Sequence, residues 1–140
     1  MNLKIATVCV SAALVMGALP MFAHHSFAAE YDQSKRVTIK DATFVRLDFV
    51  NPHSWVYFDV TDEKGVVQHW RGELGPPNGL YRSGLRPNMF KAGEKISISG
   101  NLAKDASNLM WAGSFSTADG KTYTARATEG ATDGPGGDGK

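Results

Sequence analysis

The sequence predicts an all-β protein, a small OB-fold-like Greek-key barrel with one short helix between its third and fourth strands. β-Branched and aromatic residues recur at period two, and turn residues interrupt them roughly every 8 to 12 residues. Three strands, a helix, two strands and an extra hairpin arm follow one another in the order of an OB-fold. A plain β-sandwich is the alternative architecture.

The chain begins with a predicted secretory signal peptide, residues 1–23. Its apolar run, Ile5–Leu19, is about 15 residues long and therefore shorter than the roughly 20 that a membrane-spanning helix needs. A small residue, Ala23, follows the run, and cleavage after it makes His24 the new N-terminus. Cleavage after Ala28 is the alternative, and it would remove both neighbouring histidines.

The mature chain is expected to be a periplasmic protein without disulfides. Its organisation is predicted as an N-terminal leader with a histidine pair (24–36), an OB-like barrel domain (37–127) and a disordered tail (128–140) rich in Gly and Asp. The only cysteine, Cys9, lies in the signal peptide, so the domain must be stable through its core alone.

Charge excludes several kinds of partner. Removing Lys4 with the signal peptide leaves 14 basic residues (15 − 1) against 14 acidic residues, a formal net charge of zero. Nucleic acids and anionic membranes select stripes of Lys and Arg, and the sequence has none. We therefore expect neither partner, and no membrane span after processing.

The first strand is predicted over residues 37–50, and its length indicates a bend or bulge near residues 40–42. A hairpin follows, because Gly65 can adopt the positive φ that closes a short loop between two β-rich runs, 54–61 and 66–71. These three strands form the first half of the barrel.

The second half starts with a change of pattern. Residues 75–90 hold prolines suited to a helix start and glycines suited to its end, which predicts one short helix or a pair of turns. Strands are predicted over 95–102 and 109–117, and a turn at 118–120 leads into a last strand over 121–126.

Two histidines lie within the predicted barrel, and the hairpin keeps them apart. Across the turn, Thr61 can pair with Val66 or with Val67. These two registers place His69 opposite Phe58 or Asp59, roughly 16–20 Å along the strand from His53. That separation excludes shared coordination of one metal ion. In the register that faces Asp59, His69 forms an ordinary cross-strand pair, and we expect this structural role.

The strongest metal candidate is His24. As a mature N-terminus it offers its α-amino nitrogen and its imidazole to one ion, a chelate that favours Cu(II). His25 and His53 are the candidates for a further imidazole ligand. The alternative is that two exposed histidines on a flexible leader bind nothing specific.

A second hypothesis is a barrel that binds a small ligand or a periplasmic protein without metal. Trp55 and Tyr57 alternate onto one face, with Trp70 or Arg71 opposite them, and Asn51 occupies the proline corner before the strand. Arg71 is the candidate that we expect to act with this face. Two of the three tryptophans are expected in the core.

Catalytic motifs are absent from the sequence: it has no G-x-S-x-G elbow, no H-E-x-x-H, no Gly-rich phosphate loop and no catalytic cysteine. We therefore expect a binding module and not an enzyme.

Several segments resemble a family of small exported bacterial proteins known as a domain of unknown function: "HHSFAAEYD", "FVNPHSWVYFDV", "GELGPPNGLYRSGL", "KAGEKISISG" and "MWAGSFSTADGK". The likeness covers residues 23–123. It implies export and a compact β fold, with no activity to carry over. It also favours His24, His25, Asn51 and His53 as site residues, and cleavage directly before the histidine pair.

Overall fold

The period-two pattern builds the wall of a closed barrel. In β2 (Trp55–Thr61), Val56 and Phe58 point inward and are fully buried, whereas Tyr57 between them lies on the outer surface. The computed structural model describes residues 27–125. Within them the buried apolar side chains form one core, and burying a Val, Leu, Ile or Phe side chain contributes about 1.5–3 kcal/mol.

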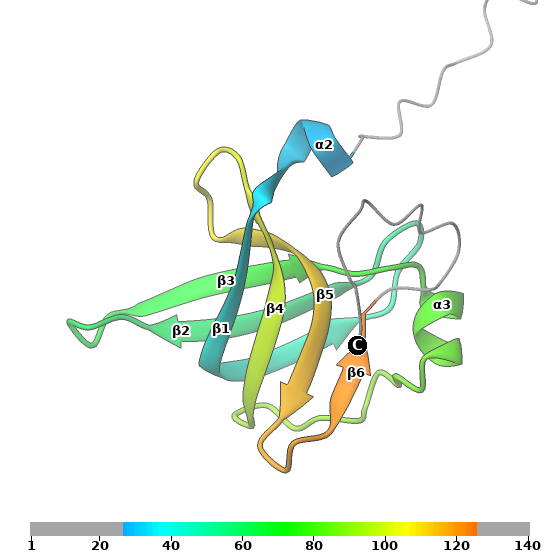
Figure 1. Cartoon of the computed structure of the whole chain (residues 1–140). Helices are drawn as coiled ribbons and strands as arrows, with labels where there is room; N and C mark the ends of the chain where they lie inside the picture. The colour runs from blue at the N-terminus through cyan, green and yellow to red at the C-terminus, as the bar shows by residue number, and fades with distance from the viewer. Residues whose placement is uncertain (1–26, 126–140) are drawn as a thin grey trace, which may run out of the picture.

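The strand order is β3-β2-β1-β4-β5-β6, and β3 also pairs in parallel with β5. That pairing closes a five-stranded barrel, which confirms the OB-like prediction (Figure 1). The other elements are α2 (Phe27–Glu30), β1 (Tyr31–Asp48), β3 (Val67–Glu73), α3 (Pro77–Arg82), β4 (Lys95–Ala103), β5 (Leu109–Thr117) and β6 (Thr122–Thr124).

The first strand starts at Tyr31 and not near residue 37, so residues 31–36 of the predicted leader belong to the barrel. After Tyr31 the side chains of this segment are polar and show no period-two pattern. They are held instead by the buried amide of Asn101, which donates to two of their carbonyls at 3.1 and 3.3 Å. The bend predicted near residues 40–42 is confirmed, because the register with β4 shifts around Asp41, whose φ is 56°.

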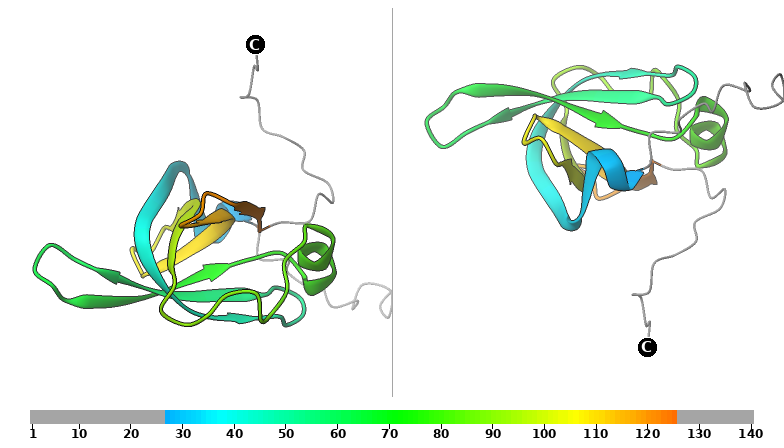
Figure 2. Two further views of the ribbon diagram at one scale, coloured as in Figure 1. Left: turned by 90° about the horizontal axis from the view of Figure 1, so that it is seen from below. Right: turned by 90° about the horizontal axis from the view of Figure 1, so that it is seen from above.

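The hairpin of β2 and β3 has the predicted turn, with Gly65 at φ 79°. Its tip projects beyond the barrel wall, as the two views of Figure 2 show. At the other end β3 continues to Glu73, beyond the predicted end at Arg71. This extension places Glu73, the central residue of the candidate site described below, within the strand.

The predicted short helix is α3, which starts after Pro76 and lies at the end of the barrel away from the hairpin tip (Figure 1). Leu80 of α3 and Leu85 just after it are fully buried against the core. None of the helices within residues 27–125 is long and apolar enough to cross a membrane.

Candidate functional site

A buried carboxylate joins three distant segments of the chain at the closing edge of the barrel. Glu73, only 6% exposed, accepts a hydrogen bond from the Tyr31 hydroxyl at Oε2. Its other oxygen, Oε1, accepts from His53 Nδ1. We call Tyr31, His53 and Glu73 the Glu73 cluster. Both carboxylate oxygens are engaged, as a buried carboxylate requires.

The close approach of β3 to the core places Glu73. A Cβ on the preceding residue, Gly72, would lie 2.8 Å from Val56 Cγ1, so the strand can run this close only with glycine there. Glu73 is paired with Trp55 on one side and with Trp111 on the other. It therefore stands at the seam between β2 and β5.

His53 is held beside Glu73 by the backbone of its own corner. The Ser54 N–H donates to the Gly75 carbonyl at 3.1 Å, and the Leu74 N–H donates to the Ser54 carbonyl at 2.9 Å. These bonds fix the corner against the end of β3. Asn51, whose peptide bond to Pro52 is cis, lies exposed at this corner, and within residues 27–125 its side chain makes no hydrogen bond with the Glu73 cluster.

Aromatic rings connect the start of the described chain to the cluster. The Trp111 ring centroid lies 5.6 Å from that of Phe27, 5.4 Å from that of Tyr31 and 5.7 Å from that of His53. The chain thus enters the barrel next to His53. The candidates His24 and His25 lie outside the described residues.

Burial raises the pKa of Tyr31 above its ordinary value of 10.0, and the hydrogen bond to the Glu73 carboxylate raises it further. The neutral phenol is therefore the stable form in the folded protein. Tyr31 is 1% exposed, so little water reaches its hydroxyl.

This shift predicts a loss of stability at high pH. Above pH 10 the unfolded chain releases the phenol proton while the folded protein retains it, so the folded state binds more protons. The free energy of unfolding should then fall by up to about 1.4 kcal/mol per pH unit. Chemical unfolding between pH 8 and pH 11 should show a shallower decline for Tyr31→Phe; equal slopes for both proteins would contradict the assignment.

The contact with Glu73 uses only one of the two imidazole nitrogens of His53, Nδ1. A carboxylate only accepts, so Nδ1 carries the proton, and Nε2 of the neutral ring keeps its lone pair. The His53 side chain is 42% exposed. Histidines that bind metals commonly donate their second ring N–H to a carboxylate in this way.

Residues 27–125 do not by themselves contain a complete set of metal ligands. Within this range no three His, Cys, Asp or Glu side chains gather closely enough to hold an ion. His69 lies elsewhere: it faces Asp59, with Nδ1 and Oδ1 2.7 Å apart, so the second of the two registers is the one formed and the expected cross-strand pair is confirmed. Further ligands beside His53 would have to come from outside the described residues.

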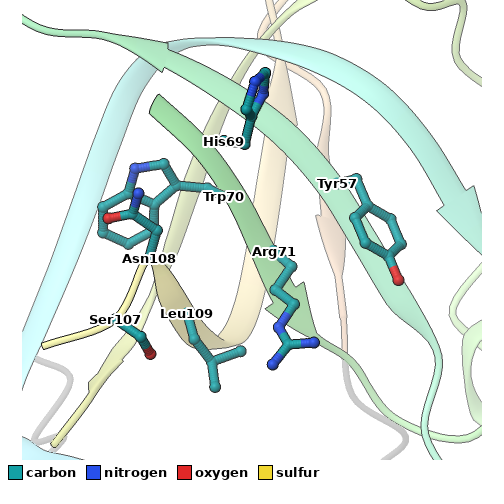
Figure 3. Close-up of a pocket in the computed structure, with 7 residues that line it drawn as sticks. All are labelled: Tyr57, His69, Trp70, Arg71, Ser107, Asn108 and Leu109. Atoms are coloured by element: carbon teal, nitrogen blue, oxygen red, sulfur yellow. The ribbon is translucent and has the colours of Figure 1, made fainter. Parts of the chain in front are cut away.

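The outer face of β2 and β3 carries the other candidates. Tyr57 is paired with Arg71, whose guanidinium carbon lies 5.2 Å from the centroid of the Trp55 ring. Next to them is a hollow of about 300 Å³, lined by Tyr57, Arg71, Leu109 and their neighbours (Figure 3). The predicted face is thus hollowed where β3 meets β5.

The expectation of two core tryptophans is wrong, because all three are only partly buried. Trp55 and Trp111 flank Glu73 at the seam, where each has one side toward solvent. Trp70 packs on Phe58 with ring centroids 6.1 Å apart, at the start of the projecting hairpin, where the barrel covers it incompletely.

Sequence reasoning missed Tyr31, Glu73 and Trp111. Each lies in one of the segments that carry the family resemblance, namely "HHSFAAEYD", "GELGPPNGLYRSGL" and "MWAGSFSTADGK". The signal for Glu73 is a lone acid between Gly72 and Leu74, at the end of a predicted strand.

Comparisons with known proteins give one match. A family model described as a family of unknown function (DUF6152) matches residues 12–110. No curated protein and no solved structure matches.

Proposed function

The chain belongs to the family of unknown function DUF6152, and from this premise we propose that it is an exported, non-catalytic binding module for Cu(II). In this proposal His53 supplies one imidazole, and His24 and His25 at the processed N-terminus supply the remaining nitrogen ligands. Imidazole and amine nitrogens in tetragonal arrangement are ligands that Cu(II) prefers.

One observation carries the proposal: Glu73 holds His53 by Nδ1, while the His53 side chain is 42% exposed. A free surface histidine would lose rotamer freedom on binding a metal, whereas this ring is already oriented. Carboxylates that accept from the second ring nitrogen of a metal-binding histidine typically strengthen metal binding about 10- to 100-fold.

The path of the chain supports a contribution from the N-terminus. Phe27 packs on Trp111 beside His53, and His25 precedes Phe27 by two residues, at most about 7 Å of chain. Cleavage after Ala23 would give His24 its free amine. Cleavage after Ala28 would instead remove Phe27 from the aromatic cluster, which argues for the earlier site.

The proposal is tested on protein purified from the periplasm, after its N-terminal mass has been measured. We expect a mass that begins at His24 and one tightly bound Cu(II) per chain by titration and by electron paramagnetic resonance. A matched protein with one alanine added before His24 should bind Cu(II) at least tenfold more weakly, because its amine no longer chelates together with that imidazole. Equal affinity of the two proteins would exclude the chelate.

The outer face of β2 and β3 supports a second candidate function, the binding of a ligand or of a periplasmic protein without metal. The hollow beside Tyr57 and Arg71 favours it. In that case a ligand should change the fluorescence of Trp55, and a metal chelator should have no effect.

A further inference from the structure

We propose that the hollow between β3 and the β4–β5 loop is a site for a small aromatic carboxylate, separate from any metal at His53. Seven residues of two segments line it: Tyr57, His69, Trp70 and Arg71 of the hairpin, and Ser107, Asn108 and Leu109 (Figure 3). The proposal names a ligand class for the second candidate function and does not depend on copper binding.

Arg71 supplies the positive charge that selects an anion. Within residues 27–125 no carboxylate lies in ion-pair range of its guanidinium. The charge of Arg71 does act on the nearby Asp105, but Asp105 is held by its own loop, since its Oδ1 accepts from Ser107 N at 3.0 Å and from Ser107 Oγ at 2.6 Å. An exposed guanidinium offers a planar fork of donors that fits a carboxylate.

Arg46, on the same face, is a useful contrast. Its Nε lies 3.1 Å from Asp48 Oδ2, and its guanidinium covers the Tyr57 ring at 3.5 Å from the centroid. Arg46 therefore already has an anionic partner and an aromatic one. Arg71 also lies near an aromatic ring, that of Trp55 at 5.2 Å, but unlike Arg46 it has no carboxylate partner within residues 27–125, so its charge is available to an anionic ligand.

The hollow is formed by backbone pairing. The Arg71 N–H donates to the Asn108 carbonyl at 3.1 Å, and Arg71 and Leu109 are partners in the parallel β3–β5 ladder. The loop is thereby held against β3. A pre-formed site loses less conformational entropy on binding than one that must be ordered.

Size and walls favour one aromatic ring. The volume of about 300 Å³ is at the lower end of the range for small-molecule sites, so a single-ring compound fits better than a polymer. Leu109 offers apolar surface on which a flat ring can pack, and the rings of Tyr57 and Trp70 lie on opposite sides of β3 (Figure 3). With Arg71 beside them, these walls complement benzoate-like compounds.

The test uses benzoate on the mature protein kept metal-free with EDTA, followed by two-dimensional ¹H–¹⁵N NMR. We expect saturable shifts at the Trp70 indole and at the Arg71 and Leu109 amides. Benzamide, which lacks the charge, and acetate, which lacks the ring, should each bind at least tenfold more weakly. Comparable binding of either compound would overturn the proposal.

Two variants locate the site. Arg71→Gln should weaken benzoate binding at least tenfold. Arg86→Gln is the matched control, because Arg86 is also exposed and lies 5.2 Å from an aromatic ring, that of Tyr81, but adjoins α3. It should bind benzoate normally. Equal affinities of both variants would rule out the Arg71 site, whatever copper titration shows.

Discussion

Replacing Glu73 with glutamine is expected to lower the affinity for Cu(II) about 10- to 100-fold while the barrel stays folded. Glutamine has the size of glutamate but one acceptor oxygen in place of two. Glu73 uses both of its oxygens, Oε2 for Tyr31 and Oε1 for His53. One of these partners must therefore lose its acceptor in the variant.

The amide nitrogen should face His53 in the variant whenever the amide oxygen keeps the Tyr31 bond. An amide N–H only donates, so Nδ1 of His53 would have to accept, and the ring proton would move to Nε2. That proton occupies the nitrogen proposed to bind Cu(II). Glu73→Gln is thus expected to weaken Cu(II) binding because the His53 ring carries its proton on Nε2, although the ring stays in the same position.

Two comparisons make this prediction specific. Tyr31→Phe removes the other hydrogen bond to Glu73 and leaves the His53 bond, so its Cu(II) affinity should stay within about threefold of the wild type. His53→Ala removes the proposed ligand itself and should weaken binding more than Glu73→Gln does. If isothermal titration finds all of these variants equal to the wild type, His53 is not a copper ligand.

The fold could be predicted from the sequence because its signals are local. Alternating apolar residues and turn glycines mark most of the strands, and the predicted strand at residues 109–117 has the same bounds as β5. The start of β1 could not be predicted in this way. Residues 32–36 are polar, and the long-range amide of Asn101 holds this segment, as no local pattern indicates.

The site was only half predictable for a related reason. The position of His53 in a proline corner is visible in the sequence. Its side chain, however, is oriented by Glu73, which lies twenty positions further on in β3. The two meet because β3 runs on past Arg71 and pairs with both β2 and β5. Closure of a barrel is a property of the whole chain, so sequence reasoning that ended the strand at Arg71 missed the carboxylate.

Among the substitutions proposed here, Gly100→Ala is expected to have the largest effect on stability. It should lower the free energy of unfolding by about 3 kcal/mol. The register between β4 and β5 shifts between Ser99 and Gly100, where the strands come very close. A Cβ on Gly100 would lie 2.2 Å from the Trp111 carbonyl oxygen and 3.0 Å from Ala112 Cα. Both are backbone atoms, so no side-chain rotation relieves the overlap, and overpacking of this kind costs 1–3 kcal/mol or more.

Gly113 on the facing strand is the matched control. A Cβ there would first meet the end of the flexible Arg36 side chain, at 3.2 Å, and that guanidinium can move aside. Gly113→Ala should therefore cost less than about 1 kcal/mol. Urea unfolding should give a clearly lower free energy of unfolding for Gly100→Ala than for Gly113→Ala. Similar values would mean that β4 and β5 can move apart at the register shift without a loss of stability.

The overlap at Gly100 also connects stability with the site. The atom in the way belongs to Trp111, whose ring packs on Tyr31 and His53. Any shift of β5 that admits the new methyl group must move this ring away from the Glu73 cluster. Gly100→Ala should therefore change the near-ultraviolet circular dichroism of the tryptophans and weaken Cu(II) binding even at temperatures where the protein is still folded, whereas Gly113→Ala should do neither.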